Sequence, residues 1–126
     1  MISQFKIFIA DPDEKRVELY KASFKLHFLV DSAHDGLMSL RKIKLHKPHV
    51  ILSAVNLPLL SGIGLLKSVR SHPELHARLF IILGREELPA ALSLGANDFF
   101  DYDISPNEMI SKIFYHIKIN RYVQID

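Results

Sequence analysis

The sequence predicts an α/β fold in which helices cover both faces of one parallel sheet. Five short apolar runs alternate with segments of helical period. Three of the runs are apolar on both alternating faces, which is typical of strands that are buried on both sides. A strict strand–helix alternation with short connections calls for right-handed crossovers, so we expect a doubly wound three-layer sandwich.

The predicted strands and helices follow directly from this alternation. The strands are residues 5–10 (FKIFIA), 28–31 (FLVD), 50–53 (VILS), 79–83 (LFIIL) and 98–100 (DFF). Helical period covers residues 13–23, 33–45, 63–71 and 106–120, and the last is the clearest because Ser105, Pro106 and Glu108 supply helix-start signals. Pro89 is tolerated only near a helix start, so the fourth helix is predicted to be short, roughly residues 89–94.

Five strands of this kind suit the flavodoxin-like order 2-1-3-4-5. The functional crevice of that fold lies at the carboxyl ends of strands 1 and 3. Those ends carry Asp11 and Pro12 in one case and Ala54 in the other. We therefore expect any functional site to form around these residues.

Length and composition restrict the class of protein. The 126 residues predict a single domain over 1–126, with 121–126 as a tail or the start of a linker. No apolar run approaches a membrane span and the first residues lack a secretory signal, so a cytoplasmic location is expected. There is no cysteine for thiolate chemistry, and 16 basic against 14 acidic residues without a dense basic run argue against nucleic-acid binding.

Several stretches, in this order and spacing, resemble one known family. They are KIFIADPDEKR at the start, AHDG (33–36), KPHVILSAVNLPLLSGIGLLKSVR (47–70), LFIIL (79–83), ALSLGANDFF (91–100) and SPNEMISKI (105–113). Together they resemble the receiver domain of two-component response regulators, the CheY-like superfamily, over essentially the whole chain. The resemblance implies a site where acids hold Mg²⁺, an aspartate accepts a phosphoryl group from a partner histidine, and a lysine and a hydroxyl assist.

Most of that chemistry is replaced in this sequence. The acid pair after the first strand becomes Asp11 and Pro12, and the acceptor aspartate becomes Ala54. The switch hydroxyl becomes Gly84 and the lysine becomes Tyr102, whereas Asn56 of the loop is kept. The resemblance therefore implies a degenerate pseudo-receiver that is no enzyme, takes no phosphate and holds no Mg²⁺ tightly.

Other side chains allow more than one interpretation. Asp11 is a leftover metal ligand or, preferably, either the N-cap of the first helix or a hydrogen-bonding partner in a polar crevice. Tyr102 either fills the crevice or contacts a partner. Leu57 and Leu59 are expected to seal the crevice over Ala54. A partner-binding surface is predicted at Tyr102, Tyr115, Ile119 and Tyr122, for a homodimer, a protein partner or a fused output domain.

Two rival functions remain open for the sequence. A small-ligand sensor would need an enclosed, polar-lined cavity beside Ala54 and Gly84. An atypical receiver still taking part in a phosphorelay would need another carboxylate in the crevice, and Asp11 is the only candidate. Leucine and tyrosine side chains filling the crevice would count against the sensor.

Overall fold

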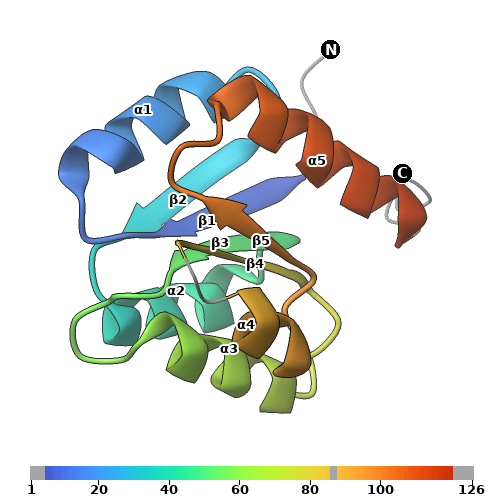
Figure 1. Ribbon diagram of the computed structural model, residues 1–126. Helices are drawn as coiled ribbons and strands as arrows, with labels where there is room; N and C mark the ends of the chain where they lie inside the picture. Colours follow the sequence, from blue (N-terminus) through green and yellow to red (C-terminus); the bar gives the residue numbers. More distant parts are fainter. Residues whose placement is uncertain (1–4, 86–87, 121–126) are drawn as a thin grey trace.

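The computed structural model describes residues 5–85 and 88–120, which form the five strands and five helices drawn in Figure 1. The strand order is β2-β1-β3-β4-β5 and all pairings are parallel, which confirms the predicted fold. In chain order the elements are β1 (Lys6–Ala10), α1 (Glu14–Phe24), β2 (Leu29–Ala33), α2 (Gly36–His46), β3 (Val50–Ala54), α3 (Gly62–Ser71), β4 (Leu79–Gly84), α4 (Leu88–Ser93), β5 (Asp98–Asp101) and α5 (Pro106–Ile119).

The largest difference from the predicted boundaries is between β2 and α2. The sequence predicts a helix from residue 33, but β2 continues to Ala33 and α2 begins at Gly36. The cause is Asp35, whose carboxylate accepts a hydrogen bond from the Met38 N–H at 2.7 Å and so caps the helix there. The fourth helix has six residues, and its predicted short length is confirmed.

The sheet separates two hydrophobic cores, one on each face. Helices α1 and α5 cover one face, and α2, α3 and α4 cover the other (Figure 1). Phe24, Phe28 and Ile113 are buried in the first core, and Phe8, Phe80 and Leu66 in the second. Because both faces are covered, β3 and β4 are buried at every position, as apolar runs of this kind predict.

The register of the strands brings their carboxyl ends to one edge of the sheet. Ala10 pairs with both Ala33 and Ser53, Ala54 pairs with Leu83, and Gly84 pairs with Asp101. The residues that follow β1, β3, β4 and β5 therefore share this edge, which is where the sequence places its candidate site.

The outer edge of β2 is partly covered by the side chains of Asp31 and Lys42. The Leu29 N–H and the Ala33 carbonyl form hydrogen bonds towards β1. Because backbone groups alternate in direction along a strand, the N–H and carbonyl groups of Val30 and Ser32 point away from β1. The Ser32 carbonyl accepts a hydrogen bond from Lys42 Nζ at 3.0 Å, and the Ser32 N–H donates to Asp31 Oδ1 at 2.8 Å. Polar caps of this kind reduce the ability of an edge strand to pair with another chain.

No helix among the described residues has the length and apolar character needed to cross a bilayer.

Candidate functional site

Asp11 is the wholly buried carboxylate at the centre of the candidate site. The Arg16 guanidinium binds it through two hydrogen bonds, Nε to Oδ2 at 2.6 Å and Nη2 to Oδ1 at 2.8 Å. The Asp13 N–H donates a third hydrogen bond to Oδ1 at 2.9 Å. Both oxygens of the carboxylate are thus engaged inside the chain, in the forked geometry that arginine makes with carboxylates.

The start of α1 places Arg16 over this carboxylate. Asp13 is the N-cap, because its side chain accepts a hydrogen bond from the Arg16 N–H, so the possibility that Asp11 caps the helix is wrong. The alternative expectation for Asp11, a hydrogen-bonding partner in the crevice, is what the structure shows. The same bond lowers the pKa of Asp13 from its ordinary value. The hydrogen bond from Arg16 to Asp11 raises the pKa of the guanidinium further above its ordinary value, so Arg16 stays charged.

Tyr102, which follows β5, lies between two guanidinium groups. The centre of the Arg16 guanidinium lies 4.2 Å from the ring centroid, and that of Arg85 lies 5.5 Å from it. Arg85 also pairs with Asp101 at 3.6 Å and with Asp103 at 3.4 Å. This series of contacts connects the segments that follow β1, β4 and β5, and it uses Tyr102 as filling for the crevice.

The remaining site positions offer little chemistry. Ala54 and Gly84 are buried, and Leu57 is buried beside them in the same core as Ala54. Leu59, in contrast, is 74% exposed, so the expectation that it seals the crevice is wrong. Its φ of 71° turns the chain at this point, which carries the side chain to the surface.

Pro12 and Asn56, the other two residues of the expected pocket, are both exposed. Among the described residues there is no group of three or more histidine, cysteine, aspartate or glutamate side chains that could hold a metal ion.

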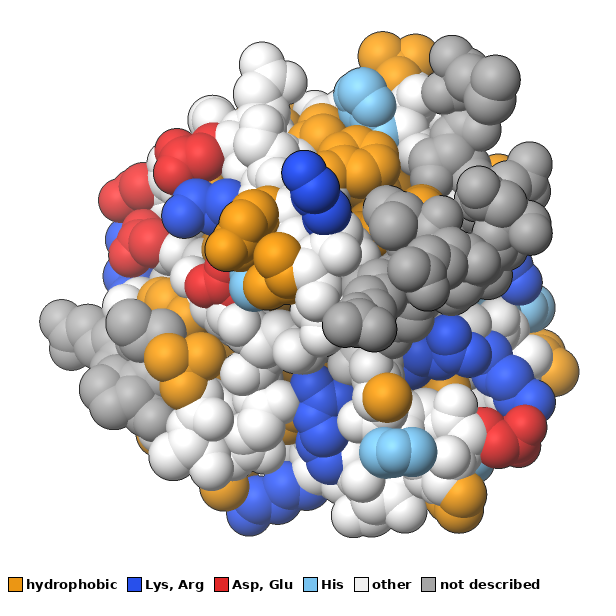
Figure 2. All heavy atoms as spheres, turned by 90° about the vertical axis from the view of Figure 1, so that its right-hand side faces the viewer, with side chains coloured by type: hydrophobic (Ala, Val, Ile, Leu, Met, Phe, Trp, Pro, Cys, Tyr) orange, Lys and Arg blue, Asp and Glu red, His pale blue; other side chains and the backbone are white. Residues whose placement is uncertain are grey.

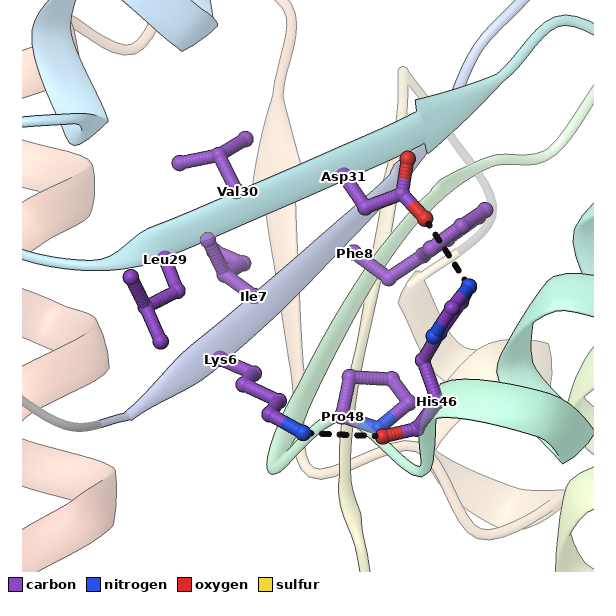
Figure 3. Close-up of a pocket in the computed structure, with 8 residues that line it drawn as sticks. All are labelled: Lys6, Ile7, Phe8, Leu29, Val30, Asp31, His46 and Pro48. Carbon is purple, nitrogen blue, oxygen red and sulfur yellow. Dashed lines mark hydrogen bonds and ion pairs between the residues drawn. The ribbon is translucent and has the colours of Figure 1, made fainter.

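Three hollows on the described surface lie away from Ala54 and Gly84. The one in Figure 3 has a volume of ≈ 260 Å³ and lies beside β1 and β2, where His46 of α2 faces Asp31 at 4.0 Å. Its walls are mainly the side chains of Ile7, Phe8 and Val30 with Pro48 beneath them (Figure 3). This hollow does not meet the condition for the small-ligand sensor, which requires an enclosed, polar-lined cavity beside Ala54 and Gly84.

A second hollow, of ≈ 380 Å³, lies between α4, β5 and α5. Its lining includes Leu92 and Tyr115, and the His116 Nε2 atom lies 2.7 Å from Asp98 Oδ2 beside them. Of the predicted partner-binding residues, Tyr115 and Ile119 are exposed on α5, Tyr102 is half-buried, and Tyr122 lies outside the described residues.

The family model of the response regulator receiver domain matches residues 7–114. The chain belongs to the response regulator receiver family. It is 33% identical over 101 residues to the probable chemotaxis protein CheY of Rhizobium etli, covering 75% of this chain and 78% of that protein. It is 31% identical over 111 residues to the transcriptional regulatory protein PhoP of Bacillus subtilis, covering 86% of this chain but only 46% of PhoP.

Solved structures of receivers agree with this assignment. The receiver domain of the Francisella response regulator 1452 aligns with a TM-score of 0.82 and 28% identity, covering 91% of this chain and 98% of that one. The chain is therefore a receiver domain of two-component signalling, a family whose members act with an output domain or a partner protein.

Arg16 and Arg85 are the two site residues that sequence reasoning did not find. The spacing of Arg16 carried a usable signal, because a helix capped at Asp13 directs its third residue back over the strand that precedes it. Arg85 carried none, since its contacts depend on β4 and β5 being neighbours.

Proposed function

We propose that this receiver is a pseudo-receiver, a protein–protein interaction module whose working state does not depend on phosphorylation. The observation that carries the proposal is the double hydrogen bond between Arg16 and the buried Asp11. The Arg16 guanidinium already neutralises the buried Asp11 carboxylate, so this acid needs no metal ion to balance its charge.

The position that accepts the phosphoryl group in the family is Ala54 here, and a methyl group has no lone pair to attack phosphorus. Asp11 lies on another strand, and its oxygens are held by Arg16 and by the Asp13 N–H. A carboxylate in that state is a poor nucleophile because its electron pairs are shared with donors. This argument also supports the expectation that the domain is not an enzyme.

The residues of the crevice do not fit Mg²⁺. This ion requires several oxygen ligands in near-octahedral geometry before it gives up its own water. Among residues 5–85 and 88–120, Asp11 is the one buried acid at this edge, and a cation at its oxygens would have to displace Arg16 against like-charge repulsion. Asn56 is exposed and adds at most one neutral oxygen.

The fixed state of the module follows from Tyr102. In the family, phosphorylation changes the surface of α4, β5 and α5. Here the ring of Tyr102 is packed between Arg16 and Arg85, which joins β5 to the start of α1 and to the end of β4. Because these contacts hold Tyr102 in place, we expect the surface of α4, β5 and α5 to stay in one conformation.

The working surface of the proposal is the face of α4, β5 and α5. Tyr115 and Ile119 are exposed large side chains of α5, and Tyr115 lines the hollow together with Leu92 and His116. Exposed aromatic and aliphatic groups around a hollow are the usual anchors of a protein interface. A homodimer, a separate partner and a fused output domain would each use the same anchors.

A phosphorylation assay tests the first part of the proposal. The chain is incubated with acetyl phosphate and Mg²⁺ and examined by intact mass spectrometry, with the probable CheY of Rhizobium etli treated in parallel. We expect no phosphoryl addition to this chain. Addition of one phosphoryl group that is lost in Asp11→Asn would instead establish the atypical phosphorelay receiver.

Sedimentation analysis tests the second part. Tyr115→Ala and Ile119→Ala are compared with Leu26→Ala, which changes an exposed leucine that does not line the hollow. A homodimer or a complex with an output domain should be weakened about tenfold by either α5 variant and left unchanged by the control. Equal association of all variants would move the interface to another face.

A further inference from the structure

The charges of this receiver are distributed unequally over its two helical layers. Between Asp35 and Glu74 the sequence has six lysine and arginine residues and no aspartate or glutamate. This segment contains α2 and α3, which lie side by side on one face of the sheet (Figure 1). Helices α1 and α5 on the opposite face carry charges of both signs.

Three of the six cations are used inside the chain. Lys42 bonds to the Ser32 carbonyl, Lys47 pairs with Glu74 at 2.8 Å, and Arg70 donates to main-chain carbonyls. The other three, Arg41, Lys44 and Lys67, are exposed, and none has an ion pair within residues 5–85 and 88–120. Half of the positive charge of this layer is thus left to the solvent.

Helical geometry turns these cations away from the sheet. Gly36, Ser39 and Ile43 face the core from α2, so Arg41 lies on the opposite side of that helix. Lys42 reaches the β2 edge, which places Lys44, about 200° further round, on the flank towards α3. On α3 the buried residues are Leu65, Leu66 and Val69, and they leave Lys67 on the outer side.

Exposed leucines alternate with the cations along α2. Leu37 is 50% exposed and Leu45 is 73% exposed, and with Arg41 they occupy positions i, i+4 and i+8 of one helical stripe. Figure 2 shows the molecule from the side. Over the lower half of the molecule, where α2 and α3 lie in Figure 1, basic and hydrophobic side chains are visible at several places and acidic ones are sparse.

We infer that the outer face of α2 and α3 binds an acidic amphipathic helix of a partner protein. The leucines are separated by cations, so the apolar area is too small to anchor the face in lipid hydrocarbon. Apolar groups about two turns apart, with positive charge between and beside them, instead match a helix whose apolar stripe is bordered by glutamate or aspartate. This site lies on the other layer from the surface of α5, and it does not depend on the state of the Asp11 crevice.

The test uses a synthetic helix of leucine and glutamate and its counterpart with every glutamate replaced by glutamine. Binding of the fluorescent peptides is measured by anisotropy, and the site is mapped by amide chemical shifts on the ¹⁵N-labelled chain. The variant Arg41→Gln/Lys44→Gln/Lys67→Gln is compared with Lys15→Gln/Lys25→Gln/Lys118→Gln, which removes the same charge from exposed positions on the layer of α1 and α5.

We expect the glutamate peptide to shift the amides of α2 and α3, and the first variant to bind about tenfold more weakly while the control variant binds as the wild type does. The glutamine peptide should bind weakly to all three proteins. Equal loss in both variants, shifts confined to α1 and α5, or no binding would overturn the inference. So would binding of the chain to phosphatidylserine vesicles without binding of the peptide, because the face would then recognise a membrane.

Discussion

Two arginines hold opposite ends of the same sheet, and they do so with different kinds of partner. At the carboxyl ends Arg16 binds the side chain of Asp11 and stacks on the ring of Tyr102. At the amino ends Arg70 donates to the carbonyls of Gly95, His76 and Arg78 at 2.7–2.9 Å and to Asn97 Oδ1 at 2.7 Å. Arg16 therefore pairs with a charged side chain, whereas Arg70 donates mainly to backbone carbonyls.

The difference predicts how each end tolerates change. A buried carboxylate needs its cation only while it is charged, so a second substitution can remove the need. The acceptors of Arg70 are mainly backbone carbonyls, which every residue type carries. A substitution at those positions therefore leaves the need for a donor at the amino ends unchanged. The carboxyl ends can therefore change their chemistry while the amino ends keep the fold, which is compatible with the proposed pseudo-receiver.

The largest expected effect is that of Arg16→Leu. It leaves the Asp11 carboxylate wholly buried without a cation and should lower the free energy of unfolding by about 3 kcal/mol. In Arg16→Leu/Asp11→Asn the charge is gone, and more than half of the loss should return. Urea unfolding of the wild type and the two variants measures this. A double variant no more stable than the single one would show that the pair matters for packing alone.

Arg70→Met should cost about 2 kcal/mol, because three carbonyls lose a donor while the aliphatic stem is kept. Here a second substitution is expected to lower the free energy of unfolding further. Asn97→Leu removes the acceptor of Arg70 and also that of the Phe80 N–H, so the double variant should be less stable than either single variant. Recovery in the double variant would remove the contrast between the two ends.

A smaller effect of opposite sign is expected at Leu59, in the loop at the carboxyl ends. Its φ of 71° is unfavourable for a residue with a branched side chain, and its 74% exposure means that little packing would be lost. Leu59→Gly should raise the free energy of unfolding by about 0.5–1 kcal/mol. This is the backbone strain that glycine removes, minus the cost of the greater conformational entropy of glycine in the unfolded chain. Leu59→Ala keeps the strain and should bring no gain in the same urea experiment.

The smallest effect concerns pH and His49, at the amino ends. Its Nδ1 accepts the Lys6 N–H at 3.0 Å, and burial, followed by the charges of Arg78 and Lys6, lowers its pKa below 6.5. The unfolded chain then takes up the proton first, so this contribution to stability is complete above about pH 6.5 and falls as the pH falls towards the lowered value.

His49→Asn places an amide oxygen near Nδ1 and carries no titrating group. Its unfolding free energy should therefore decline less than that of the wild type between about pH 7 and about pH 5, a range that spans the ordinary pKa of histidine. Equal declines would show that His49 is as easily protonated in the folded chain as in the unfolded one.

The fold could be predicted because its signals are local. Apolar runs such as VILS and LFIIL read as strands buried on both faces, and Pro89 limited α4 before any contact was known. For the candidate site the sequence predicted its place, at the carboxyl ends of the strands, and the small side chains of Ala54 and Gly84 there. What fills the site depends on Arg16 meeting Tyr102, 86 positions away in the sequence, and on side-chain geometry that periodicity does not encode.

The polar caps on the outer edge of β2 have a consequence for handling the protein. With the amide and carbonyl of Ser32 occupied by Asp31 and Lys42, an adjacent molecule finds too short a run of backbone to continue the sheet. Concentrated solutions should consequently resist fibril growth from this side, and Lys42→Ala is the change that would expose the edge and shorten the shelf life of the sample.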